Sequence, residues 1–167
     1  MSKDINLVGL DIKKILQYQR NRYPFLFLDR IISIVPGEKA TGIKCFTYNE
    51  MFIPGHFDDE PNVPGFLQLE CLVQTFLMTF QSLDEFKGLK VNDAAFNNVK
   101  FKRKIIPGDV LLVEAELHSI KEGVATGSAR STVDAEVACS ADFVVDIPEI
   151  LNRFKPNAMV AICEDQI

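Results

Sequence analysis

A histidine and a glutamate fourteen positions apart are the side chains of this sequence best suited to proton transfer. They stand in the stretch GHFDDEPNVPGFLQLE, residues 55–70, with His56 near its start and Glu70 at its end. His56 follows Pro54-Gly55, a pair that favours a tight loop presenting the next side chain. An imidazole is a suitable base near neutral pH, and a carboxyl group that keeps its proton is a suitable acid. The alternative for His56 is a merely solvated loop residue.

Glu70 lies in a long apolar segment. Residues 64–83 are apolar almost all round, which predicts a helix buried on most sides, and Glu70 is its only charged residue. An ionised, unpaired carboxylate is costly in such a place, so Glu70 must be neutral, paired or at an interface. The segment also has the length of a membrane span, but its glutamines, threonines and serine argue against one.

Two neighbours of Glu70 extend this predicted site. Gln74 is one helical turn further on and can hydrogen-bond the carboxyl group, unless its amide is satisfied elsewhere. Gly65 begins the helix after Pro64, where unpaired backbone N–H groups can polarise a carbonyl oxygen, although proline is common at helix starts. Base, acid and oxyanion site together suit removal of a proton beside a carbonyl with loss of a leaving group from the next carbon.

Other reaction classes lack the residues they need. The G-x-S-x-G element of serine hydrolases is absent from the sequence. His118, the second histidine, falls in another predicted strand beside Glu114 and Glu116, so we interpret it as solvated and predict no metal site. The cysteines show neither zinc-ligand nor disulfide spacing, which predicts reduced thiols at Cys45, Cys71, Cys139 and Cys163.

Composition limits the possible partners and compartment. The chain has 167 residues, 47% of them hydrophobic, which is enough for one compact core. Its net charge of −5 argues against a broad surface for nucleic acid or anionic membranes. The N-terminus lacks the pattern of a signal peptide, so we expect a cytoplasmic protein.

The remaining elements predict an α+β fold. A short helix is predicted after Asp11, and residues 25–35 and 39–48 are predicted to form a hairpin around a Pro-Gly-Glu turn. Further strands are expected at about 95–104, 109–121, 124–133 and 136–146. We therefore predict a curled antiparallel sheet around the long helix, in one domain over residues 1–147, with a tail of unread role at 148–167.

Three motifs resemble the FabZ-type 3-hydroxyacyl-[acyl carrier protein] dehydratases. They are RYPFLFLDRI, GHF..EPNVPGFLQLE..VQ and VKFKRKIIPGD, and the resemblance runs from about Arg22 to Phe143. It implies a hotdog fold and a homodimer with active sites at the subunit interface, often in a hexamer formed as a trimer of dimers. It implies dehydration in fatty-acid or related biosynthesis without a cofactor, on substrates carried by the phosphopantetheine of acyl carrier protein.

The resemblance also implies residue roles. His56 would be the base, Glu70 of the other subunit the acid, and the backbone N–H of Gly65 the donor to the thioester oxygen, with Phe57 and Gln74 as further substrate-binding residues. Glutamate at position 70, where the isomerising FabA-type relatives carry aspartate, favours simple dehydration. The sequence departs from the family pattern at Asn21, Asp58, Asn62-Val63 and Asn98.

A basic run provides a predicted docking patch for the acidic carrier protein. Lys100, Lys102 and Lys104 alternate along the strand expected at 95–104, and Arg103 adds a fourth charge. A solvated strand edge is the alternative interpretation. Two other functions stay open at this point, a hotdog acyl-thioester hydrolase and a non-catalytic acyl-carrier-binding subunit.

Overall fold

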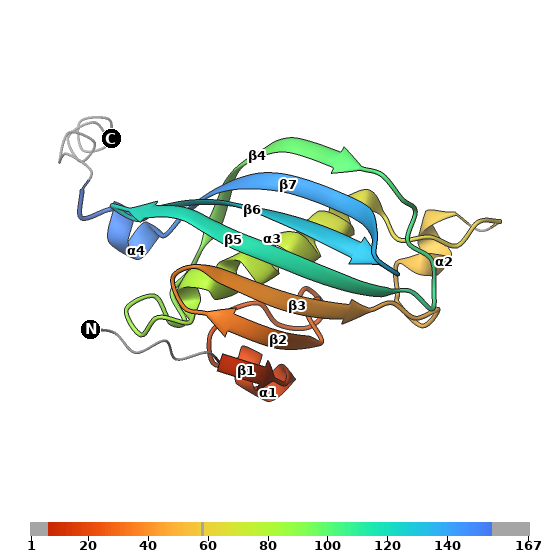
Figure 1. Cartoon of the computed structure of the whole chain (residues 1–167), viewed down its shortest axis with the longest axis horizontal. Coiled ribbons are helices and arrows are strands. Elements are labelled where there is room, and N and C mark those ends of the chain that lie inside the picture. The colour runs from red at the N-terminus through yellow and green to blue at the C-terminus, as the bar shows by residue number, and fades with distance from the viewer. Residues whose placement is uncertain (1–6, 58, 155–167) are drawn as a thin grey trace, which may run out of the picture.

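Seven antiparallel strands form one sheet that lies across a long helix, as Figure 1 shows. A computed structural model describes residues 7–57 and 59–154. The strands are β1 Leu7–Leu10, β2 Arg30–Val35, β3 Lys39–Cys45, β4 Asn92–Phe101, β5 Val110–Lys121, β6 Val124–Val133 and β7 Glu136–Asp146. The helices are α1 Ile12–Ile15, α2 Ile53–His56, α3 Gly65–Gln81 and α4 Pro148–Leu151. The predicted α+β architecture with a long central helix is confirmed.

The strand order in the sheet is β1-β2-β3-β5-β6-β7-β4. Hairpins join β2 to β3, β5 to β6 and β6 to β7, whereas β4 pairs with β7 at the opposite edge from β1. The connection from β3 to β5 contains α2, α3 and β4, so the candidate base and acid both come from this long crossing segment (Figure 1).

Helix α3 packs closely on the sheet because two facing strand positions are glycines. A Cβ atom at Gly42 in β3 would lie 2.7 Å from the hydroxyl oxygen of Thr75. A Cβ atom at Gly127 in β6 would overlap the ring of Phe76. The Phe76 ring instead stacks on Phe143 of β7, with ring centroids 5.5 Å apart. This close contact fixes the distance between α3 and the sheet.

The boundaries of several elements differ from the prediction. Strands β6 and β7 match it, and Asp11 caps α1 by accepting a hydrogen bond from the Lys14 N–H at 3.0 Å. The expected strand over 25–35 begins only at Arg30, and the expected strand over 95–104 ends at Phe101. Both extensions were wrong. The Phe25 and Phe27 N–H groups bond to the Arg22 carbonyl oxygen and the Gln74 side chain, and the N–H groups of Lys102 and Arg103 both point to the carbonyl oxygen of Ala138, which breaks the ladder. Three short elements were not predicted: β1, α2 and α4.

Candidate active site

His56 ends α2, and its ring is held by a backbone carbonyl group. Its Nδ1 lies 3.1 Å from the carbonyl oxygen of Asn62. A carbonyl oxygen only accepts hydrogen bonds, so the proton of the neutral ring belongs on Nδ1 and the lone pair on Nε2. The side-chain amide of Asn62 donates in turn to the Glu60 carbonyl oxygen at 2.8 Å. The loop thus fixes the tautomer that leaves Nε2 free to act as a base.

The loop before α2 is anchored by a buried lysine. Lys44, on the helix-facing side of β3, is only 8% exposed, and its Nζ lies 2.7 Å from Glu50 Oε1 and 3.7 Å from Asp29 Oδ1. The Glu50 carbonyl oxygen accepts from the Ile53 N–H at 3.0 Å, at the start of α2. Burial alone would lower the pKa of Lys44, but the hydrogen bond to Glu50 and the charges of Asp29 and Glu50 raise it overall.

Sequence reasoning missed this anchor, although a signal for it exists. Lys44 stands two and four positions after Gly42 and Ala40, and all three alternate onto the buried side of β3. A charged residue at an inward-facing strand position needs a partner, so this alternation alone could have indicated an internal ion pair.

Phe57 contacts His56 directly. The two ring centroids are 4.1 Å apart and the rings are tilted by 40°. Phe57, Phe66 and Phe101 are all at least half exposed, although each is a large apolar side chain. Phe66 belongs to the first turn of α3 and the Phe101 ring lies against Gly65, so exposed apolar side chains at the start of this helix are suited to contact a ligand or a second protein chain.

Glu70 lies one turn into α3, and its carboxyl group accepts hydrogen bonds from two side chains. Gln74 donates a short hydrogen bond to Glu70 Oε1, and Asn21 donates to the same oxygen at 3.4 Å. Burial is the main influence and raises the pKa of Glu70; the hydrogen bond from Gln74 lowers it in part, and the charge of Asp93 raises it. The expected shift toward a protonated carboxyl group is therefore present.

Gln74 is buried and every part of its side-chain amide is used. Its Oε1 accepts from the Phe27 N–H at 2.9 Å, and its Nε2 donates to the Phe25 carbonyl oxygen at 2.6 Å as well as to Glu70. The amide of Gln19 donates to the Gln74 carbonyl oxygen. Gln74 therefore holds the segment 19–27 against α3 and orients Glu70 at the same time.

Gly65 is the first residue of α3, as predicted. The backbone N–H of a first helical residue has no acceptor within its own helix. A Cβ atom at Gly65 would lie 3.1 Å from two carbons of the Phe101 ring, so a side chain here would displace that ring. The Phe101 ring therefore packs against Gly65, and both residues line a cavity of about 300 Å³ at the start of the helix.

Within the described residues, the predicted site residues fall into two groups. His56 and Phe57 contact each other, and Glu70 and Gln74 contact each other, with Asn21 beside Glu70. His56 and Glu70 have separate hydrogen-bond partners in the single chain. Asn21 was noticed in the sequence only as a departure from the family pattern, and its contact with Glu70 could not be seen there.

The basic run is divided by the end of β4. Lys100 and Lys102 are exposed, and among the described residues neither has a recorded ion pair. Arg103 lies within 3.6 Å of Asp109 and 3.4 Å of Glu136, and Lys104 pairs with Glu60. The alternation predicted for Lys100, Lys102 and Lys104 on one strand was wrong, since β4 ends before Lys102.

The remaining predicted features have simple places. His118 is exposed on β5, with its Nε2 3.0 Å from the Ser128 hydroxyl oxygen, and Asn98 donates to Asp142 at 2.6 Å. Cys71 and Cys139 are buried and Cys45 is exposed, all as free thiols, whereas Asp58 and Cys163 lie outside the described residues.

Over residues 7–57 and 59–154 no helix is long and apolar enough to cross a membrane.

The FabA-like domain family matches residues 20–142 of this chain. The 3-hydroxyacyl-[acyl-carrier-protein] dehydratase FabZ of Clostridium novyi is 43% identical over 140 residues, which are 83% of this chain and 99% of that protein. The protein of the same name from Caldicellulosiruptor saccharolyticus is 43% identical over 137 residues, which are 82% of this chain and 98% of that protein. The range matched by the family model spans positions 56 and 70.

Solved structures with low sequence identity share the fold. A chain of the dehydratase heterocomplex ApeI:P from Xenorhabdus doucetiae has a TM-score of 0.71 at 13% identity, covering 83% of this chain and 95% of that one. The sigma28-regulated virulence protein Cj0977 of Campylobacter jejuni has a TM-score of 0.58 at 16% identity, covering 76% of this chain and 80% of that one. The predicted hotdog fold is confirmed.

Proposed function

We propose that this chain is a dehydratase of 3-hydroxyacyl thioesters. It belongs to the FabA-like domain family and, within it, to the FabZ-type 3-hydroxyacyl-[acyl-carrier-protein] dehydratases. The reaction is the removal of water from a (3R)-3-hydroxyacyl thioester to give the trans-2-enoyl thioester, in fatty-acid or related acyl-chain biosynthesis. The observation that carries this proposal is the half-buried Glu70 carboxyl group, which Gln74 orients and whose pKa is raised by burial.

Each step of the elimination has a candidate residue. Nε2 of His56 takes the proton from the carbon next to the thioester carbonyl, and the Gly65 N–H stabilises the negative charge that develops on the thioester oxygen. The bond from the third carbon to its hydroxyl group then breaks, and Glu70 gives its proton so that water leaves. The proton gained by His56 returns to Glu70 through solvent, which restores both groups.

The environments of the two groups support this division of roles. The Asn62 carbonyl oxygen holds His56 in the tautomer with a free Nε2, while burial keeps Glu70 toward its protonated form. The elimination rearranges electrons within the substrate and needs no redox partner. The acyl group would arrive on the phosphopantetheine of acyl carrier protein.

We also propose that the working unit is a homodimer in which His56 of one subunit meets Glu70 of the other. The two residues have separate partners within one chain, and exposed phenylalanines surround the start of α3. Burial of such side chains at a subunit interface is favourable by roughly 25 cal/mol per Å². The cytoplasmic location and a hexamer of three such dimers stay predictions.

The first experiment tests the reaction. The protein is incubated with 3-hydroxyacyl groups on acyl carrier protein, and the products are followed by mass spectrometry. An enoyl thioester, lighter than the substrate by one water molecule, supports dehydration. A free acid would identify a thioester hydrolase instead, and unchanged substrate with retained carrier binding would identify a non-catalytic subunit.

A second experiment tests the shared site. His56→Ala and Glu70→Gln variants, each inactive alone, are unfolded together and refolded as a mixture. Mixed dimers would contain one site with both native residues, so about a quarter of wild-type activity should return. No recovery, with mixed dimers demonstrated by mass spectrometry, would place both residues of a site in one chain.

A further inference from the structure

A cavity of about 470 Å³ lies along α3 beyond Glu70. Asn21, Leu77, Gln81, Leu89 and Val91 contribute to its wall, and we call it the Gln81 pocket. Asn21 connects it with the proposed site, because this residue lines the cavity and donates to Glu70 at 3.4 Å.

The positions of its helical residues place the pocket downstream of the acid. Leu77 and Gln81 follow Glu70 by seven and eleven positions, so all three share one face of α3. At the α-helical rise they lie about 10 and 16 Å from Glu70 along the helix axis. If Glu70 protonates the hydroxyl group on the third carbon, the rest of the acyl chain can extend along this face.

The pocket changes from apolar to polar along its length. Leu77 is 7% exposed and apolar, whereas the equally buried Gln81 presents an amide. The Gln81 Nε2 donates to the Leu89 carbonyl oxygen at 3.1 Å, which fixes the orientation of the amide. Gln81 Oε1 is buried and has no hydrogen-bond partner among the described residues. Arg20 and Lys90, both exposed, also line the cavity.

A saturated chain gains affinity from Leu77 but not from this polar end. Each methylene group buried against apolar atoms is worth about fourfold in binding. A methylene group placed against the Gln81 amide gains less, because contact with a polar group returns less transfer free energy than contact with apolar atoms. Beyond the amide, the charged groups of Arg20 and Lys90 stay hydrated.

We propose that the Gln81 pocket receives the distal end of the acyl chain and that Gln81 limits the length of saturated chain that is used efficiently. This inference rests on the proposed dehydratase function and names its substrate class. The preferred substrates are short to medium saturated 3-hydroxyacyl groups, whose ends stop beside Leu77.

The experiment compares substrates of different length on the same carrier protein. The ratio of kcat/KM for 3-hydroxytetradecanoyl to that for 3-hydroxybutyryl is measured for the wild type, for Gln81→Leu and for Gln17→Leu. Gln17 is exposed and serves as the matched amide control. Gln81→Leu, which keeps a similar volume without the amide, should raise the ratio by at least about tenfold, and Gln17→Leu should leave it unchanged.

A second variant keeps the test informative if Gln81→Leu does not fold. Leu77→Phe narrows the cavity without removing the Gln81 hydrogen bond, so the same ratio should fall about tenfold or more. Melting temperatures identify any variant that does not fold. An unchanged ratio in a folded Gln81→Leu or Leu77→Phe variant overturns the inference while dehydration by the wild type stands. A wild type that dehydrates none of the substrates overturns the proposed function itself.

Discussion

Gln74 donates to the Glu70 carboxyl group from one turn further along α3, and the same amide holds the backbone of Phe25 and Phe27. The orientation of the proposed acid is therefore tied to a segment remote in sequence. Because a hydrogen bond to the charged form favours ionisation, Gln74 also opposes the effect of burial on the Glu70 pKa.

A Gln74→Leu variant should move the alkaline limb of the activity profile to higher pH. Loss of the hydrogen bond removes an influence that lowers the Glu70 pKa, so the carboxyl group keeps its proton over a wider range. The free energy of unfolding should also fall by about 1–3 kcal/mol, because the Phe27 N–H and Phe25 carbonyl lose their partner. kcat measured from pH 5 to 10 checks this, and an alkaline limb at the wild-type pH contradicts it.

A Glu70→Gln variant should gain stability relative to the wild type as pH rises. The pKa of Glu70 is raised in the folded chain, so protonation of this carboxyl group favours the folded state. This contribution to stability is complete below the unfolded pKa of about 4.3. That contribution is lost as the pH rises through the folded pKa. Urea unfolding of both proteins between pH 4 and pH 8 measures the difference. A difference independent of pH would mean that Glu70 titrates as an ordinary exposed carboxyl group.

A His56→Ala variant should lose dehydration by roughly 10²- to 10⁴-fold while keeping its fold, because the ring acts mainly in the transition state. The matched control is His118→Ala, which removes the exposed histidine of β5. Enoyl formation and circular dichroism are measured on both variants. Near-wild-type turnover by folded His56→Ala would remove this residue from the mechanism.

A Lys44→Met variant should lose about 1–3 kcal/mol of unfolding free energy, since Glu50 and Asp29 are left without their buried partner. Its kcat should fall as well, because Glu50 holds the start of α2, which carries His56. Lys39→Met alters an exposed lysine of the same strand and should change neither quantity. Lys44→Arg should restore part of the activity, and if Lys44→Met matches Lys39→Met the anchor is unimportant.

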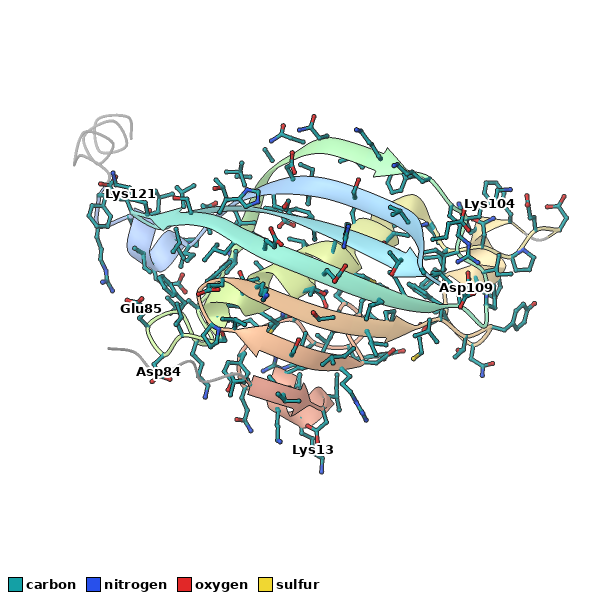
Figure 2. All side chains as sticks on the ribbon, viewed as in Figure 1. Lys13, Asp84, Glu85, Lys104, Asp109 and Lys121 are labelled. Carbon is teal, nitrogen blue, oxygen red and sulfur yellow. The ribbon has the colours of Figure 1, made fainter. Side chains whose placement is uncertain are left out.

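Charge reversal at Lys100 and Lys102 should weaken use of carrier-bound substrate, with a steep dependence on salt, and spare small pantetheine substrates. Arg103 is left unchanged in this test, because it pairs with Asp109 and Glu136. Lys121→Glu is the control at the far end of the sheet from Lys104, as Figure 2 shows. Equal losses on both substrate types would indicate damage to the active site instead of lost docking.

Helices and strands with a local sequence pattern were predicted correctly. Segments whose conformation depends on contacts with distant residues were not. Alternation located β6 and β7 correctly, and the apolar run located α3. Residues 25–29 look like strand, yet Phe25 and Phe27 bond to the Gln74 side chain, 47 positions away from Phe27. Residue type and spacing singled out His56, Glu70 and Gln74; the expected hydrogen bond from Gln74 to Glu70 is present, and the catalytic roles stay predictions. The contact of Asn21 with Glu70 depends on packing between distant segments and could not be found that way, whereas the inward-facing position of Lys44 was a signal that went unused.

The position of β4 has a consequence for synthesis of the chain. β4 is completed before β5, β6 and β7 are made, yet its recorded neighbour in the sheet is β7, the last of them. A nascent chain that has emerged only as far as β6 therefore carries β4 without its hydrogen-bonding partner, and Phe76 lacks the ring of Phe143. Until the ribosome delivers β7, the backbone groups of this strand are unpaired and can pair with other chains, a risk that a chaperone would reduce.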